Sequence, residues 1–118
     1  MLTGGGDCPG LNAVIRAVTR RSIAREHSVV GVRAGWRGLV EDQLEPLGSR
    51  EISGILPRGG TIIGTSRTNP YKVEGGVDRV LANFPKHLDA LVAIGGEDTL
   101  GVASRLHAAV CPGLSSRR

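Results

Sequence analysis

Three glycine-rich stretches limit how this chain of 118 residues can fold more than any other feature. They span residues 4–10, 59–67 and 94–99, and each is flanked by a segment typical of a strand or a helix. Glycine lets the backbone turn sharply and present its N–H groups to an anion, because it has no side chain to interfere. One such stretch is a common turn. Three of them in a short chain indicate a phosphorylated ligand.

The segments between the glycine stretches predict alternating strands and helices. Met1–Thr3 is predicted as the end of a strand that runs into the first stretch. After that stretch, Leu11, Val14, Ile15 and Val18 recur at helical spacing and predict an amphipathic helix. The later predicted elements are a strand over residues 28–32, a helix over 77–88 that Pro85 ends early, a buried parallel strand over 88–94 and a helix over 99–109.

This order of elements predicts an α/β fold with a parallel sheet in a three-layer sandwich. Residues 1–110 are predicted to form one α/β domain or one piece of a larger domain. Residues 111–118 are predicted to form a divergent, disordered tail, because they show no periodicity. The region over residues 35–53 is mixed, with a predicted turn at Trp36 and Gly38. In such sheets ligands bind outside the carboxyl ends of the strands, where the first and third glycine stretches fall.

Composition narrows the class of partner. The net charge of +4 comes mostly from arginine, which suits a phosphorylated small molecule. Nucleic acid is not expected, because aromatic residues make up 3% of the chain and no basic run is interleaved with them. A membrane is not expected either, since no apolar run is long enough to cross one. Cys8 and Cys111 form no Cys-x-x-Cys pair, so neither a disulfide framework nor a zinc site is predicted, and the default location is the cytoplasm.

The first two glycine stretches each leave two interpretations open. Residues 4–10 can present N–H groups to an anion at a helix start, but they match neither a P-loop nor a Gly-x-Gly-x-x-Gly fingerprint. An ordinary tight turn is equally compatible with them. In the second stretch, Arg67 offers a planar fork of donors suited to a phosphoryl group in transfer. The alternative is a surface arginine, and the glycine neighbours favour the functional interpretation.

The third stretch gives the sharpest local signal. Glu97 and Asp98 follow two glycines at the end of a predicted strand. Adjacent carboxylates there can hold Mg²⁺ on a phosphate, because this ion prefers oxygen ligands and keeps several of its waters. The alternative is that Asp98 caps the next helix while Glu97 is solvated in its first turn. The two interpretations are compatible.

Together, the three stretches resemble the N-terminal part of the 6-phosphofructokinase family. Residues 4–16 closely match its opening motif, and residues 58–67 and 94–99 match its next two motifs in order and spacing. The resemblance covers residues 2–109, and the third motif is like that of pyrophosphate-dependent members. It implies the phosphorylation of fructose 6-phosphate to fructose 1,6-bisphosphate with Mg²⁺, by an enzyme whose full-length members are homo-oligomers.

The resemblance also implies roles for particular residues. Arg67 would contact the transferred phosphate, and Glu97 would be the carboxylate on the magnesium side. The implied donor-binding residues are Gly6, Arg67, Thr68, Gly96, Glu97, Asp98 and Thr99.

Four further residues match family positions of a different kind. Trp36 falls where ATP-using members often place an aromatic ring near adenine, although packing in a turn explains it equally well. Arg16, Arg20 and Arg58 match positions that bind allosteric effectors in bacterial members. For Arg20, a solvated helix face is the safer interpretation.

Asp98 bears on the identity of the phosphoryl donor. ATP-dependent members usually have glycine at this position, whereas pyrophosphate-dependent members have aspartate. A carboxylate there crowds and repels the α-phosphate of a nucleotide, and the shorter pyrophosphate avoids it. Pyrophosphate is therefore the favoured donor, with ATP as the alternative.

The chain lacks the family's next motif, whose aspartate acts as the base on the sugar hydroxyl. Residues 111–118 have a different pattern, so we expect the chain by itself to be inactive and to fold poorly. Two other classes stay open. One is a kinase of the NAD kinase or lipid kinase type, which uses a similar glycine loop after a strand. The other is a non-catalytic remnant that still binds phosphate.

Overall fold

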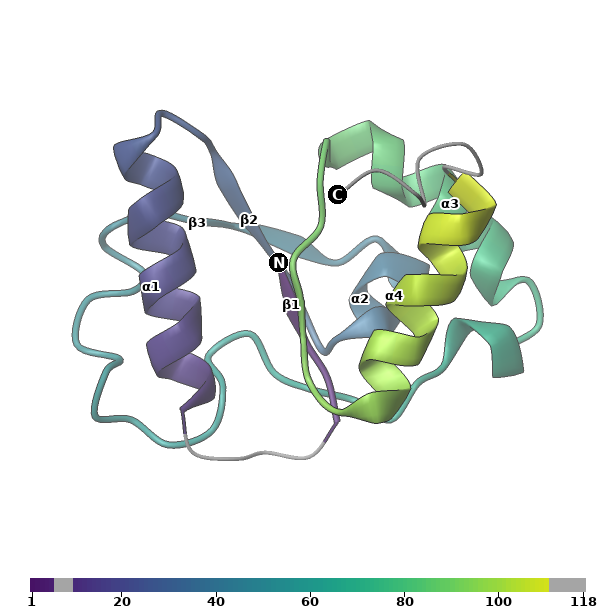
Figure 1. Ribbon diagram of the computed structural model, residues 1–118, viewed down its shortest axis with the longest axis horizontal. Helices are drawn as coiled ribbons and strands as arrows, with labels where there is room; N and C mark the ends of the chain where they lie inside the picture. Colours follow the sequence, from purple (N-terminus) through teal and green to yellow (C-terminus); the bar gives the residue numbers. More distant parts are fainter. Residues whose placement is uncertain (6–9, 111–118) are drawn as a thin grey trace.

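The computed structural model describes residues 1–5 and 10–110 of the chain, which form strands and helices in alternation (Figure 1). The elements, in order, are β1 (Leu2–Thr3), α1 (Leu11–Ala24), β2 (Val29–Val32), α2 (Trp36–Glu41), β3 (Leu44–Leu47), the 3₁₀ turn η1 (Pro70–Lys72), α3 (Gly76–His87), β4 (Ala93–Ile94) and α4 (Glu97–Val110).

The strands lie in the spatial order β3-β2-β1-β4. β1 pairs with β4 in parallel, and β2 pairs with β3 in antiparallel fashion. Two backbone hydrogen bonds join these pairs, because the amino group of Met1 donates to the Val30 carbonyl at 2.6 Å and the Val32 N–H donates to the Met1 carbonyl at 2.8 Å. A residue that bonds two residues of the neighbouring strand, one on each side of its partner, is typical of a parallel pair. The predicted parallel sheet is therefore confirmed, with β3 as an antiparallel edge that was not predicted.

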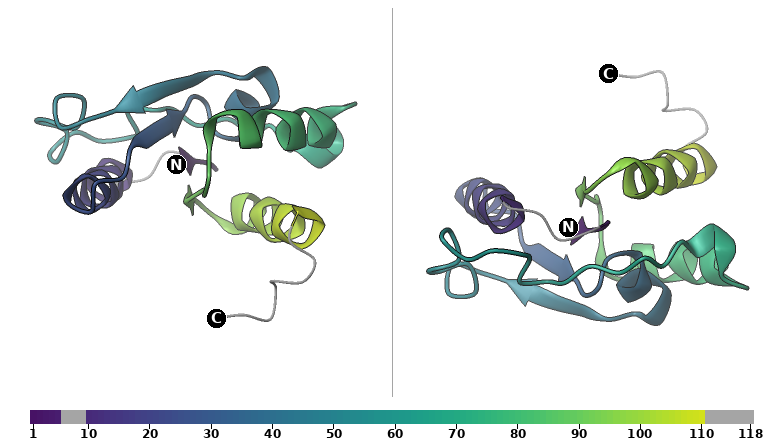
Figure 2. Two further views of the ribbon diagram at one scale, coloured as in Figure 1. Left: turned by 90° about the horizontal axis from the view of Figure 1, so that it is seen from above. Right: turned by 90° about the horizontal axis from the view of Figure 1, so that it is seen from below.

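Helices cover both faces of the sheet. Figure 2 shows α1 on one side of the strands and α2, α3 and α4 on the other. Alternate residues of β1 point to opposite faces, so Leu2 joins the core cluster under α2, α3 and α4 while Met1 joins the cluster under α1. Each cluster is apolar, with Ile15 and Leu39 fully buried at their centres. The predicted α/β sandwich of three layers is confirmed.

The topology predicts where a ligand binds. From β1 the chain moves to β2 on one side and later reaches β4 on the other side, with the intervening helices on opposite faces. The strand order thus reverses at β1 and β4. In parallel α/β sheets such a reversal opens a crevice at the carboxyl ends of the strands. Thr3 and Ile94 are these ends, and the first and third glycine stretches follow them directly.

Two local predictions about helices were wrong. Pro85 does not end α3 early. It removes only the hydrogen bond that position 85 would donate, the helix continues to His87, and the Leu88 N–H donates to the Phe84 carbonyl at 2.9 Å. The expected turn at Trp36 and Gly38 is helix α2. Gly38 is there for close packing, since a Cβ would overlap the carbonyl of Arg33.

Of the predicted buried strand over residues 88–94, only Ala93–Ile94 forms a strand, which is β4. None of the apolar residues of this segment is fully buried, and Val92 is 44% exposed. Among the described residues, β4 pairs with β1 alone, so one edge of this strand has no neighbour. The predicted tail over residues 111–118 and the predicted site residue Gly6 lie outside the described residues. Within residues 1–5 and 10–110, none of the helices has both the length and the apolar character that crossing a bilayer requires.

Candidate functional site

A cavity of about 260 Å³ lies at the carboxyl ends of β1 and β4, where the topology predicts a ligand site. All three glycine stretches contribute to its wall. Its lining residues are Gly5, Trp36, Ser66, Arg67, Thr68, Asn69, Lys72, Asp98, Thr99 and Val102. The cavity therefore brings together segments that are up to about ninety residues apart in the sequence.

Two glycines allow the first and third stretches to lie side by side. The Gly4 N–H donates to the Ile94 carbonyl at 2.9 Å, which continues the pairing of β1 with β4. A Cβ at Gly4 would overlap the buried side chain of Thr99, and a Cβ at Gly95 would come within 2.7 Å of the Gly4 carbonyl oxygen. Neither position accepts a side chain without movement of its neighbours. The glycines here serve close packing between two loops.

The second stretch is anchored to the ends of β1 and β2. The Thr3 hydroxyl donates to the Gly64 carbonyl at 2.9 Å, and the Ser66 hydroxyl donates to the Ala34 carbonyl at 2.6 Å. Gly35 has a φ of +61°, and a Cβ there would lie 2.9 Å from the Thr3 carbonyl oxygen. These contacts carry the next residues, Arg67 and Thr68, into the cavity wall.

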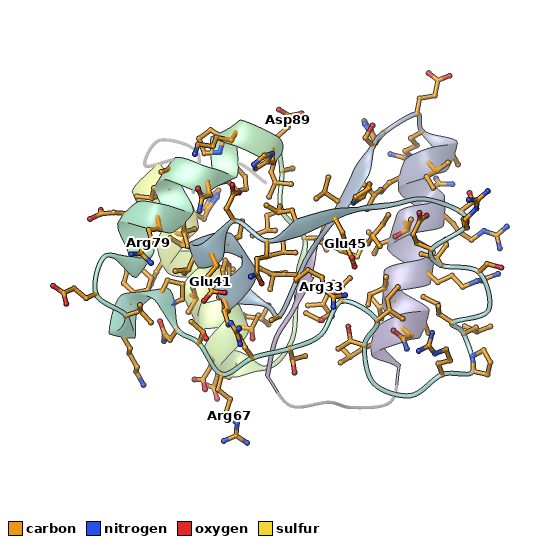
Figure 3. All side chains as sticks on the ribbon, turned by 180° about the vertical axis from the view of Figure 1, so that it is seen from behind. Arg33, Glu41, Glu45, Arg67, Arg79 and Asp89 are labelled. Atoms are coloured by element: carbon orange, nitrogen blue, oxygen red, sulfur yellow. The ribbon has the colours of Figure 1, made fainter. Side chains whose placement is uncertain are left out.

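Charged side chains of both signs line the cavity. Arg67 is exposed, and Figure 3 shows it extending away from the ribbon. Lys72 is a second cation in the wall, and Asp98 is the carboxylate. Such a set can hold an anion by its cations while the carboxylate limits the anion's size or recruits a divalent metal ion.

Lys72 is a site residue that sequence reasoning missed. It reaches the cavity because the turn η1 starts at Asn69, whose side-chain oxygen accepts a hydrogen bond from the Tyr71 N–H at 2.9 Å. Arg105 of α4 lies over the Tyr71 ring, 4.9 Å from its centre, and holds η1 against α4. The sequence signal that could have indicated this position is the pair Asn69-Pro70, which is typical of a turn.

The structure gathers four of the seven predicted donor-binding residues. Arg67, Thr68, Asp98 and Thr99 line the cavity, whereas Gly96 and Glu97 are outside its wall, and Gly6 lies outside the described residues.

The helix-cap alternative for Asp98 was wrong, since α4 begins at Glu97 and Asp98 lies inside its first turn. Trp36 is 3% exposed and belongs to the core cluster of α2, so packing accounts for its burial, while part of it borders the cavity.

Comparison with known proteins decides the family. The family model described as phosphofructokinase matches residues 1–114. This chain belongs to the phosphofructokinase family. Among solved structures, the phosphofructokinase of Pichia pastoris in the T-state superposes with a TM-score of 0.83 and 38% identity, covering 90% of this chain and 12% of that one.

Two relatives illustrate the donor classes within this family. A protein of Amycolatopsis methanolica named pyrophosphate–fructose 6-phosphate 1-phosphotransferase is 60% identical over 108 residues, covering 90% of this chain and 32% of that protein. The ATP-dependent 6-phosphofructokinase 3 of Streptomyces coelicolor is 48% identical over 109 residues, covering 90% and 32%. The chain thus spans about a third of the length of the relatives it matches.

The site is compatible with a Mg²⁺ ion that is shared with a phosphate. Within the part of the chain that the structure describes, no three histidine, cysteine or acidic side chains converge as a metal cage. Mg²⁺ commonly takes one or two protein carboxylates and fills its shell with phosphate oxygens and water. Asp98 in the cavity wall and its neighbour Glu97 at the start of α4 meet that requirement.

The three predicted effector arginines are separate from the cavity at the ends of β1 and β4. Arg16 and Arg20 lie on α1, on the opposite face of the sheet from α4, and Arg58 belongs to the segment that packs beside α1. Arg16 is half-buried, and Arg20 and Arg58 are exposed. None of the three lines this cavity.

Proposed function

We propose that residues 1–110 supply the phosphoryl-donor part of a 6-phosphofructokinase, which phosphorylates fructose 6-phosphate to fructose 1,6-bisphosphate in glycolysis, in the cytoplasm. One observation carries this proposal. The cavity at the switch between β1 and β4 joins all three family motifs and contains two cations and one carboxylate. Phosphoryl transfer depends mainly on positioning and on charge stabilisation, and this wall offers groups for both.

Each charged residue has a role that its chemistry supports. Arg67 holds the transferred phosphoryl group, because its planar guanidinium can donate two parallel hydrogen bonds to phosphate oxygens. Lys72 adds a point charge on the same wall. Thr68 and Thr99 offer hydroxyl donors, and Thr99 is held in place against Gly4.

The backbone around the third motif contributes as well. The N–H groups at the start of the 14-residue helix α4 attract negative charge. Gly96 precedes them, and a Cβ there would meet no atom within 4 Å, so a phosphate has room to approach. By its motif position, Gly6 contributes a further N–H from the first stretch.

Mg²⁺ is the proposed metal ion, and when bound it neutralises negative charge on the donor phosphates. Glu97 is its proposed protein ligand, with Asp98 beside it in the cavity wall. One or two carboxylates in addition to phosphate oxygens are a usual protein share for this ion.

Pyrophosphate is the proposed donor, and two independent observations support it. Asp98 lines the cavity, where its carboxylate repels any phosphate beyond the two that pyrophosphate carries. The relatives named for pyrophosphate are 53–61% identical to this chain, whereas four named as ATP-dependent are 43–51% identical. A carboxylate that excludes the wrong donor is a common basis of specificity.

A chimaera tests this function directly. Residues 1–110 are joined to the remaining part of the Amycolatopsis methanolica relative, roughly two-thirds of that protein. We expect fructose 6-phosphate to be phosphorylated with pyrophosphate and at least about tenfold more slowly with ATP. Arg67→Ala should abolish turnover. Arg79→Ala should not, because Arg79 is exposed on α3 and lines no part of the cavity (Figure 3). Robust turnover with ATP and none with pyrophosphate would refute the donor assignment.

The sequence leaves two alternative functions open, and the family match and the chimaera bear on them differently. A kinase of the NAD kinase or lipid kinase type is disfavoured, because the family model that matches is phosphofructokinase over nearly the whole chain. A non-catalytic remnant would bind pyrophosphate but leave the chimaera inactive. The isolated chain, which spans about a third of its relatives, is expected to bind donor without turnover.

A further inference from the structure

The side chain of Asn12 bridges two of the family motifs. It stands in the first turn of α1, directly after the first glycine stretch, and is 1% exposed. Its Nδ2 donates to the carbonyl of Arg58 at 3.1 Å and to the carbonyl of Gly59 at 3.2 Å. Its Oδ1 accepts the Ile62 N–H at 2.8 Å. One buried side chain therefore satisfies three backbone groups at the start of the second stretch.

Only a carboxamide of this length meets all three groups. Two carbonyls require a donor with two hydrogens, and the N–H requires an acceptor on the same side chain. An aspartate would place an oxygen against the two carbonyl oxygens. A leucine of similar size would remove all three hydrogen bonds and put apolar atoms against these partly buried backbone groups, which destabilises that arrangement.

The segment that Asn12 holds continues into the donor cavity. The hydroxyl of Thr3 bonds the Gly64 carbonyl, and Ser66 bonds the Ala34 carbonyl, immediately before Arg67. Asn12 fixes the other end of this same segment, on the far face of the sheet under α1. Asn12 itself lines no part of the cavity. Its effect on a donor would therefore be transmitted through the second stretch.

We propose that Asn12 is a positioning residue, which holds the second glycine stretch in the conformation that presents Arg67 to the donor. The part of this proposal that concerns the donor rests on the proposed function, and the part that concerns the loop does not. The two parts are separated by measuring the ligand-free chain first.

The first experiment compares Asn12→Leu with the 118-residue wild-type chain by NMR, without ligand. We expect amide exchange of Ile62 to be faster by about fivefold or more, the effect of losing one hydrogen bond. The amide signals of Ser66, Arg67 and Thr68 should shift as well. Asn12→Ala, which leaves room for water to reach the three backbone groups, is the milder variant should Asn12→Leu not fold.

Ile55→Val provides the matched control, because Ile55 is a buried residue of the core cluster under α1 and its substitution destabilises the fold without removing a hydrogen bond. In this control the signals of residues 66–68 should stay in place. Equal shifts in the control and in the Asn12 variants, or unchanged signals in both, would overturn the proposal.

The second experiment measures the dissociation constant for pyrophosphate with Mg²⁺ at a temperature where every variant is folded. We expect it to rise about tenfold in the Asn12 variants and to stay within about twofold in Ile55→Val. Affinity that falls equally in the control would show a merely structural role. If the wild-type chain binds no pyrophosphate, the proposed function fails, and the ligand-free NMR result still decides whether Asn12 positions the loop.

Discussion

Thr99 lies so close to Gly4 that a single methyl group on Gly4 would overlap its side chain. Gly4 follows β1 and Thr99 stands in the first turn of α4, so this contact sets the distance between the first and third family motifs. Thr99 lines the cavity that we assign to the donor, and Gly4 directly precedes Gly5, which lines it as well. Close packing between Gly4 and Thr99 therefore helps to define the position of the cavity wall.

Gly4→Ala is predicted to lower the free energy of unfolding by about 1–3 kcal/mol, because the added methyl overpacks a buried contact. Thermal and urea denaturation measure the change. Gly101→Ala is the matched control, since a Cβ at this position of α4 meets no atom within 4 Å. It should raise the free energy of unfolding by about 0.5–1 kcal/mol through higher helix propensity. A tolerated Gly4→Ala would show that the two motifs can separate without cost.

Asp98→Gly is predicted to shift donor preference towards ATP. Removing the carboxylate relieves repulsion of a third phosphate group, so the ratio of ATP to pyrophosphate affinity should rise by about tenfold or more. Calorimetric titration of both donors measures this ratio. Glu97→Gln serves as the comparison, because Glu97 is outside the cavity wall and its loss should weaken Mg²⁺ dependence without changing the ratio. An unchanged ratio in Asp98→Gly would remove the structural reason for preferring pyrophosphate.

Folding of the chain is predicted to depend on pH through the amino group of Met1. Burial lowers the pKa of this group from 8.0 to about 6. The unfolded chain keeps the proton up to about pH 8, and the folded chain releases it above about pH 6. Between these values the unfolded state binds more protons, so stability rises with pH.

The free energy of unfolding should increase by about 2 kcal/mol from pH 6 to pH 8. Urea denaturation across this range measures the increase. An N-acetylated chain is the control, because it keeps an N–H for the Val30 carbonyl but has no amine to titrate. The same increase in the acetylated chain would assign the effect to other groups.

The isolated chain is predicted to be only weakly stable, as its sequence already suggested. β4 has one edge without a neighbour among the described residues, and Val92 and Leu100 are 44% and 50% exposed. Apolar surface that remains in water contributes nothing to folding. We expect a free energy of unfolding below about 5 kcal/mol, the lower end for natural domains. A value well inside the usual range, from urea denaturation followed by circular dichroism, would contradict this.

The long, periodic elements of the fold could be predicted from the sequence. Leu11 and Ile15 marked α1 by their spacing, and both are buried in the structure. Two short elements, β3 and α2, could not be predicted in the same way. β3 contains Glu45 and Pro46, which are unfavourable in a strand, and it is tolerated as an edge strand that pairs with β2 alone. Helix α2 depends on the left-handed residues Gly35 and Asp42 at its ends, which local propensity does not predict.

The sequence indicated the cavity residues that belong to the glycine motifs. It did not indicate a residue that only the tertiary structure brings to the cavity. Arg67 and Asp98 were predicted from their motifs, and both line the cavity. Lys72 reaches the cavity because η1 packs against α2 and α3 and contacts α4 through Tyr71 and Arg105. The bridge made by Asn12 joins residues about fifty positions apart, and no local pattern indicates such a pair.

Isothermal titration of the 118-residue chain with pyrophosphate and Mg²⁺ tests the central claim most directly. We expect one saturable site, with affinity reduced about tenfold or more in Lys72→Ala, because Lys72 lines the cavity. Lys86→Ala should bind as the wild type does, since Lys86 is exposed on α3 and outside the wall. Binding that is absent, or that both lysine variants weaken equally, would contradict a donor site at this cavity.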